Sequence, residues 1–179
     1  MSPAPTKPNF WGGVEECTSG KWTGGGRIDA PNPDYDDGAT GTTTLPGKTT
    51  FGFNVFLGSN ADGRCVVTKG EIEVNYHPSQ TSWHVSIHDG VDEFGEPVFA
   101  EVVDPDASGR GACLVVGVDP VTARVDGNQS TDQVQFEICD NDRGSAQNSG
   151  TDAMRWISNG YGDTDLTYLT GGNIVDHGP

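Results

Sequence analysis

Lysine and long apolar runs are both scarce in this sequence. Only four of the 179 residues are lysine, and 26 acidic residues against 10 basic ones give a formal net charge of -16. Such a surface repels the phosphates of nucleic acids and the headgroups of anionic membranes. Apolar runs extend over only a few residues, as from Cys113 to Val116, whereas a membrane-spanning helix needs about 20. We therefore expect neither nucleic-acid binding nor insertion into a membrane.

Closely spaced cysteine pairs are missing too. The four cysteines, Cys17, Cys65, Cys113 and Cys139, are scattered, and neither they nor the histidines show the spacing of a zinc site. An even number of cysteines in a chain of extracellular character favours two disulfides, for which three connectivities are possible. Buried free thiols are the alternative, because cysteine is among the most buried residue types.

No segment shows the period of an amphipathic helix. Apolar and polar residues instead alternate with the period of a half-buried strand in four segments: Thr49 to Leu57, Glu71 to Tyr76, Trp83 to His88 and Val134 to Cys139. Ala112 to Val118 is more continuously apolar, which predicts a central strand. Asp-Gly and Asn-Gly steps between these segments are typical of tight turns. The pattern predicts an all-β fold, either an antiparallel β-sandwich or a flattened barrel.

The first 22 residues differ in character from the rest of the chain. Three of the first eight residues are proline, which favours an extended course. Phe10 and Trp11 follow, and we expect them to dock on a partner. The sequence therefore predicts an extended N-terminal arm over residues 1–22 and a single β-sandwich domain over residues 23–179.

Two glycine-rich words lie near the ends of the predicted domain. They are TGGGRI, from Thr23 to Ile28, and TGGNI, from Thr170 to Ile174. A phosphate-binding loop needs a helix after its glycines and usually a lysine, but the first word leads into Asp29 and prolines. We therefore exclude a nucleotide site. We expect matched bulged segments in the first and last strands, which lie near each other and close the sandwich.

Five motifs follow one another along the chain: Thr23 to Ile28, Lys48 to Asn54, Gly70 to His77, Asp140 to Gly144 and Thr170 to Ile174. In this order they resemble the post-COAP domain, a small bacterial domain of secreted and surface proteins. The resemblance covers nearly all of the predicted domain and implies a compact β-sandwich without an established enzymatic activity. The N-terminal arm, the acidic loop after the first motif and a DPVT insert depart from the pattern of that family.

Acidic residues gather in two places that offer oxygen ligands for calcium. They lie in the loop DAPNPDYDDG and in the turn DNDRG, and the candidate ligands are Asp29, Asp34, Asp36, Asp37, Asp140 and Asp142. Neither segment carries the complete EF-hand pattern, which ends in a glutamate. A solvated acidic turn is the alternative, because Asp and Asn are common turn residues. No cofactor is required by these motifs, and calcium is the candidate that they offer.

Groups for nucleophilic catalysis are close together only in the sequence. His84, Ser86, His88 and Asp89 fall within six residues. On a strand, however, the two histidines lie about 13 Å apart along the chain. No G-x-S-x-G motif accompanies them. We expect a polar outward face at this strand and no catalytic residues.

Aromatic residues near loops are candidates for stacking on sugars. Trp22 and Tyr35 lie beside the first glycine word and in the acidic loop, whereas Trp83 alternates with Val85 and Ile87 and is expected in the core. The alternative is that all of these aromatics are packing residues.

These features predict a non-enzymatic structural or adhesive β-domain with an extracellular, cell-surface or virion-surface location. We expect it to assemble with copies of itself or with another surface or shell protein through its N-terminal arm, as in a surface layer, a filament or a virion decoration. The alternative is a calcium-dependent carbohydrate-binding module. The N-terminus MSPAPTKPNF does not show the charged and then apolar pattern of a signal peptide.

Overall fold

The computed structural model describes residues 20–30, 47–103, 112–140, 152–160, 162–164 and 167–177. Within these ranges the ordered elements are strands, and none is a helix. The strands are β1 (Gly20–Ala30), β2 (Gly47–Ser59), β3 (Cys65–Tyr76), β4 (Thr81–Ile87), β5 (Phe99–Val103), β6 (Ala112–Val125), β7 (Asn128–Asp140), β8 (Ala153–Ser158), β9 (Gly162–Asp163), β10 (Thr167–Tyr168) and β11 (Gly171–Asp176). The predicted all-β fold is confirmed.

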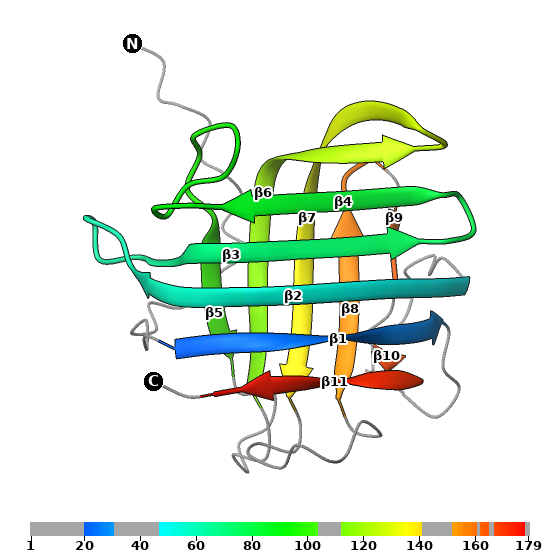
Figure 1. The fold of residues 1–179 in the computed structure, drawn as a ribbon, viewed down its shortest axis with the longest axis horizontal. Helices are drawn as coiled ribbons and strands as arrows, with labels where there is room; N and C mark the ends of the chain where they lie inside the picture. The colour runs from blue at the N-terminus through cyan, green and yellow to red at the C-terminus, as the bar shows by residue number, and fades with distance from the viewer. Residues whose placement is uncertain are drawn as a thin grey trace.

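The strands form one antiparallel sheet that folds over into two layers. The order along the sheet is β10-β8-β7-β6-β4-β3-β2-β1-β11, with β5 pairing with β3 and β6, and β9 pairing with β8. Strands β4, β3, β2, β1 and β11 form a front layer, and β5, β6, β7 and β8 run crosswise behind it (Figure 1). The predicted sandwich is therefore made from a single continuous sheet.

Strand β6 passes from the back layer to the front layer. Its first part pairs with β5, as between Gly117 and Phe99, and its last part pairs with β4, as between Thr122 and His84. Between the two parts the pairing with β7 shifts by one residue, between Val118 and Val121. An extra residue of this kind bends a strand and increases its twist, which is how a strand turns the corner between crosswise layers.

Aromatic side chains join the two layers in the core. Trp83 on β4 is fully buried, as predicted, and its ring centroid lies 4.7 Å from that of Trp156 on β8. The indole nitrogens do not remain unpaired on burial. Trp156 Nε1 donates to Thr49 Oγ1 at 3.1 Å, and Trp83 Nε1 donates to Asp132 Oδ2 at 2.8 Å. Each indole thus contributes both apolar area and a directional contact to the core.

Tyr76 packs against the same ring cluster, with its ring centroid 5.2 Å from that of Trp156. Burial raises the pKa of this phenol above its usual value of 10.0. A raised folded-state pKa gives a stabilisation that is complete below the unfolded value and is lost as the pH rises through the folded value. We therefore expect Tyr76→Phe to lose less unfolding free energy than the wild type above about pH 10 in denaturant titrations. An equal alkaline loss in both proteins contradicts this prediction, and Tyr168→Phe is the control.

The first and last strands pair directly, as the two glycine words predicted. The register runs without interruption from Trp22 opposite Asp176 to Arg27 opposite Gly171, so the predicted bulge is wrong. The glycines instead allow close contact between two backbones. A Cβ on Gly172, where φ is +104°, would lie 2.1 Å from the carbonyl oxygen of Gly25. The glycine words therefore close the front layer through an unusually tight strand pair.

Two buried carboxylates cover the edge of β11 that does not pair with β1. Asp152 Oδ2 accepts a hydrogen bond from the backbone N–H of Ile174 at 2.8 Å, and Asp140 Oδ2 accepts one from that of Asp176 at 2.9 Å. Asp140 lies in β7 and Asp152 directly before β8, so these contacts tie the front layer to the back layer. They also satisfy amide groups that would otherwise form an open sheet edge.

Candidate functional site: a polar groove on the front layer

The outward face of the front layer carries a groove of about 510 Å³. The side chains that line it come from β2, β3 and β4, and they are Thr50, Asn54, Glu71, Glu73, Asn75 and His84. All six carry hydrogen-bonding groups, and four of them are exposed to solvent. We call this feature the glycine groove, after Gly52 in its floor.

The floor of the groove is at Gly52 on β2, which is on the outward face and has no side chain. A Cβ added at Gly52 would meet no atom within 4 Å. Gly25 on β1 lies directly opposite Gly52, so no side chain stands beside the floor on that strand. Glu73 on β3 lies opposite Gly52 on the other side and lines the groove. The hollow is therefore bounded by a carboxylate on its β3 side.

The walls of the groove follow from the alternation of strand β3. Ile72 and Val74 point into the core, so Glu71, Glu73 and Asn75 point outward. Asn75 Nδ2 donates a hydrogen bond to Glu73 Oε1 at 3.0 Å. This contact leaves Glu73 with further acceptor capacity, because an ionised carboxylate has about four lone-pair sites.

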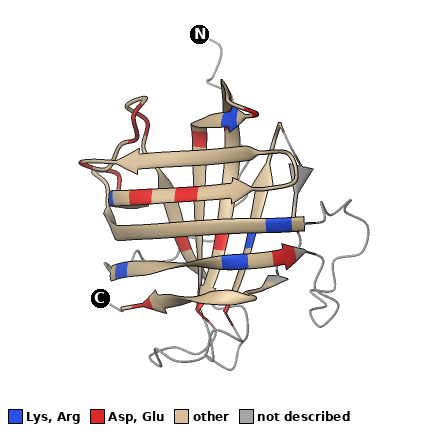
Figure 2. Cartoon of the chain, turned by 45° about the vertical axis from the view of Figure 1, so that its right-hand side comes forward, with Lys and Arg blue, Asp and Glu red and all other residues tan. Residues whose placement is uncertain are grey.

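Within the described part of the chain, neither carboxylate of the groove forms an ion pair. Among the described residues, the ion pairs join Arg27 with Asp29 at 3.1 Å and Arg155 with Glu137 at 2.6 Å. The lysines nearest in the sheet order, Lys21 and Lys69, lie over the ring of Phe56, with Nζ 5.3 and 5.9 Å from its centroid. The acidic positions in the middle of β3 are visible on the front layer (Figure 2). The groove is therefore a negatively charged surface.

A larger hollow of about 870 Å³ lies beside the β2–β3 turn. Much of its lining comes from turns, through residues such as Asn60 and Gly90. The side chains of the glycine groove instead stand on three adjacent strands, of which β3 pairs with both β2 and β4, and this pairing holds their spacing more precisely. We therefore place the candidate site in the glycine groove.

Sequence reasoning did not find this groove. The predicted alternation from Glu71 to Tyr76 contains the signal that Glu71 and Glu73 share one face of the strand. The remaining part of the site depends on the pairing of Glu73 with Gly52 and with His84, which belong to other strands. No local pattern predicts which outward residues of two strands become neighbours.

The predicted calcium ligands are only partly described. Asp29 Oδ2 lies 3.1 Å from Arg27 Nε and accepts a hydrogen bond from Thr170 Oγ1 at 2.9 Å. The carboxylate of Asp140 is buried, and its contact with the backbone of β11 accounts for that burial without a metal. The other predicted ligands lie outside the described residues; they are Asp34, Asp36, Asp37 and Asp142. Calcium binding there stays a prediction.

The aromatic candidates for ligand binding have different outcomes. Trp22 is only 1% exposed and belongs to the core, so the prediction that its ring stacks on a sugar at the surface is wrong. The same residue lies in β1, which begins at Gly20, so the sandwich starts before the predicted boundary at residue 23. Tyr35, Phe10 and Trp11 lie outside the described residues, as does most of the predicted arm. The loss of Trp22 removes one of the two stacking residues on which the carbohydrate alternative depended.

The histidine-rich strand has the polar outward face that was predicted. His84 and His88 are exposed, while the alternating residues of β4 are in the core. Ser86 Oγ and His88 Nε2 are 3.4 Å apart, a long contact. Within the described ranges, no carboxylate forms a hydrogen bond or ion pair with these imidazoles, so the orienting group of a catalytic triad is not found there.

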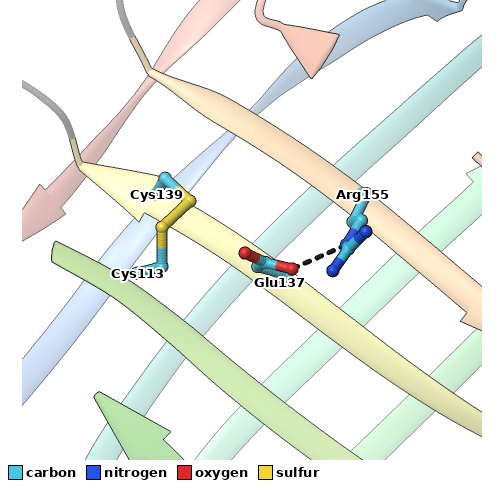
Figure 3. Close-up of a disulfide and its surroundings, with 4 residues drawn as sticks. All are labelled: Cys113, Glu137, Cys139 and Arg155. Carbon is cyan, nitrogen blue, oxygen red and sulfur yellow. Dashed lines mark hydrogen bonds and ion pairs between the residues drawn. A yellow bond between two sulfur atoms is a disulfide. The ribbon is translucent and has the colours of Figure 1, made fainter. Parts of the chain in front are cut away.

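A disulfide joins Cys113 and Cys139, which lie directly opposite each other on β6 and β7. Beside it, Arg155 Nε lies 2.6 Å from Glu137 Oε2, so adjacent cross-strand contacts link β6, β7 and β8 (Figure 3). Cys65 is disulfide-bonded as well. The predicted disulfide chemistry is therefore confirmed for these cysteines. One group of potential metal ligands was found in the described part, Cys113, Glu137 and Cys139, but its sulfur atoms form the disulfide and offer no thiolate.

Comparison of the chain with protein-family models, with curated proteins and with solved structures finds no match. The resemblance to the post-COAP domain therefore rests on the order of the five motifs. Among the described residues, no helix is long and apolar enough to cross a membrane.

Proposed function

We propose that this chain is a non-enzymatic adhesive β-domain of an outer surface, which holds a partner in the glycine groove. The observation that carries this proposal is the hollow over Gly52, lined by hydrogen-bonding side chains on paired strands. A concave, polar site on a rigid sheet supports recognition through several directed hydrogen bonds at little cost in ordering the protein.

The disulfides support the location in this proposal. Cross-links of this kind persist in oxidising environments and are rare where thiols are kept reduced. The strongly negative charge supports it as well, because it keeps a surface domain soluble and discourages contact with nucleic acids. Assembly through Phe10 and Trp11, with copies of this chain or with another surface or shell protein, remains a prediction.

Filling the groove tests whether it binds anything. Gly52→Thr places a side chain in open space at a strand position where threonine is favoured, so we expect the fold to be kept. Beads coated with the wild type will be retained on at least one surface of an array of polysaccharides and of acidic and basic proteins. Beads coated with Gly52→Thr will lose at least about 80% of that retention, since the new side chain occupies the space of a bound group.

The matched control is Gly171→Thr, which adds the same side chain at a strand glycine outside the groove where a new Cβ also meets no atom within 4 Å. Circular dichroism and the melting temperature show whether each variant is folded. Wild-type beads that bind no surface, or equal retention of wild type and Gly52→Thr, would rule out the groove as an adhesive site.

A further inference from the structure

We infer that the glycine groove binds an extended basic segment of a partner protein, with lysine or arginine at alternate positions. This inference rests on the proposed function, because it names the ligand class of the same groove. It is carried by three features of the groove: its unneutralised charge, the spacing of its carboxylates and the chemistry of its floor.

Charge complementarity is the first argument. Glu71 and Glu73 are both exposed, and within the described ranges neither forms an ion pair. The nearby cations are directed elsewhere, since Arg27 lies against Asp29 and Lys69 lies over an aromatic ring. A chain with a net charge of -16 also attracts cationic partners over a longer range. A ligand that carries positive charge is therefore attracted during its approach and stabilised once it is docked.

The spacing of the carboxylates is the second argument. Glu71 and Glu73 are two residues apart on one strand, so their attachment points are separated by about 7 Å. Among the described residues, they do not belong to a group of three or more carboxylates, histidines and cysteines whose ligand atoms converge within 4.8 Å. Alternate side chains of an extended peptide have the same spacing of about 7 Å, because that peptide has the same rise per residue.

The floor of the groove is the third argument. Gly52 leaves the backbone of β2 uncovered in the floor, so the narrow main chain of a peptide can approach it closely. Phe51 and Phe53 contribute to the floor, but each is only 7% exposed and belongs to the core cluster. The lining thus presents no exposed aromatic ring on which a sugar could stack. A peptide with cationic side chains fits this lining better than an amino sugar does.

Fluorescence anisotropy with a defined peptide tests the inference. The probe is a labelled heptapeptide in which lysine alternates with threonine, titrated with the full chain at low ionic strength. The variant Glu71→Gln/Glu73→Gln keeps the shape of the groove and removes two charges. We expect its affinity for the probe to fall about tenfold, as for the loss of two exposed ion pairs. Added salt will weaken the binding of the wild type more than that of the variant.

The matched control is Asp62→Asn/Glu96→Gln, which removes the same charge from two exposed positions that do not line the groove. It will bind the probe within about twofold of the wild type. An affinity loss equal to that of the groove variant would show attraction to overall charge and overturn the inference. Unchanged binding by the groove variant would overturn it as well.

A chitosan oligomer serves as the competing cationic ligand. If the wild type binds this oligomer and not the peptide, the ligand is an amino sugar and the inference is wrong. If the wild type binds neither probe while Gly52→Thr abolishes retention on the array, the proposed function stands and the basic-peptide assignment fails. Binding of the peptide by the wild type and its loss in both groove variants supports the two proposals together.

Discussion

Replacing Cys113 and Cys139 by alanine is expected to lower the free energy of unfolding by about 3.5 kcal/mol. The disulfide spans a sequence separation of 26 residues, and closing a loop of that length removes this much chain entropy from the unfolded state. Both cysteines are buried, so the change also removes packed sulfur atoms without leaving a thiol in their place. Denaturant unfolding of the double variant without reductant measures the effect.

The wild type in reductant is the comparison for this variant. Its loss of stability will be at least as large, because Cys65 also belongs to a disulfide that reductant breaks. The double variant should still bind the basic probe in the cold, since the cross-link lies in the back layer and the glycine groove on the front layer. A change in unfolding free energy below about 1 kcal/mol would mean that the cross-link contributes little to this fold.

The second large effect is expected from Gly172→Ala, which lowers the unfolding free energy by at least about 3 kcal/mol. The new Cβ would lie 2.1 Å from the carbonyl oxygen of Gly25, in a backbone conformation that alanine rarely adopts. Neither atom belongs to a flexible side chain, so β11 has to move away from β1. Ile174, which is fully buried, would then lose part of its packing.

Gly171→Ala is the control for that experiment. Its Cβ would meet no atom within 4 Å, and no left-handed backbone conformation is required there. We expect a change within about 1 kcal/mol, of either sign. Hydrogen exchange will show faster opening of β1 and β11 in Gly172→Ala alone. If both alanine variants are equally stable, tight pairing of these strands does not limit the stability of the sandwich.

The edge strand β11 is held from both of its sides. β11 is held on one side by close backbone pairing with β1 and on the other by the carboxylates of Asp140 and Asp152. Asp140 was a predicted calcium ligand, because a buried carboxylate that accepts a backbone N–H has the same sequence signature as an acidic turn. The sequence shows that residue 140 is acidic. Only the fold shows that a backbone N–H group of β11 faces its carboxylate.

Local patterns predicted the strands β2, β3, β4, β6 and β7, but they did not predict β5, β8, β9 or β10. The alternation in β4 placed Trp83 in the core, and the Asp126–Gly127 step predicted a tight turn. Both residues of that step have positive φ values, 48° and 80°, and they join β6 to β7. These features depend on residues that are close in sequence. Their geometry follows from the alternation of side chains along a strand and from the backbone preferences of turn residues.

The sequence by itself thus determined the all-β class, the inward and outward faces of the main strands, their turns and the negative charge of the surface. The tertiary structure decided that Trp22 is buried, that Cys113 pairs with Cys139, and that Gly25 lies beside Gly52. The physical reason is that strand pairing is made by generic backbone hydrogen bonds, so neighbours across a sheet are selected by the packing of the whole core. The glycine groove is a product of that selection, because its lining needs residues of three strands whose meeting no local pattern specifies.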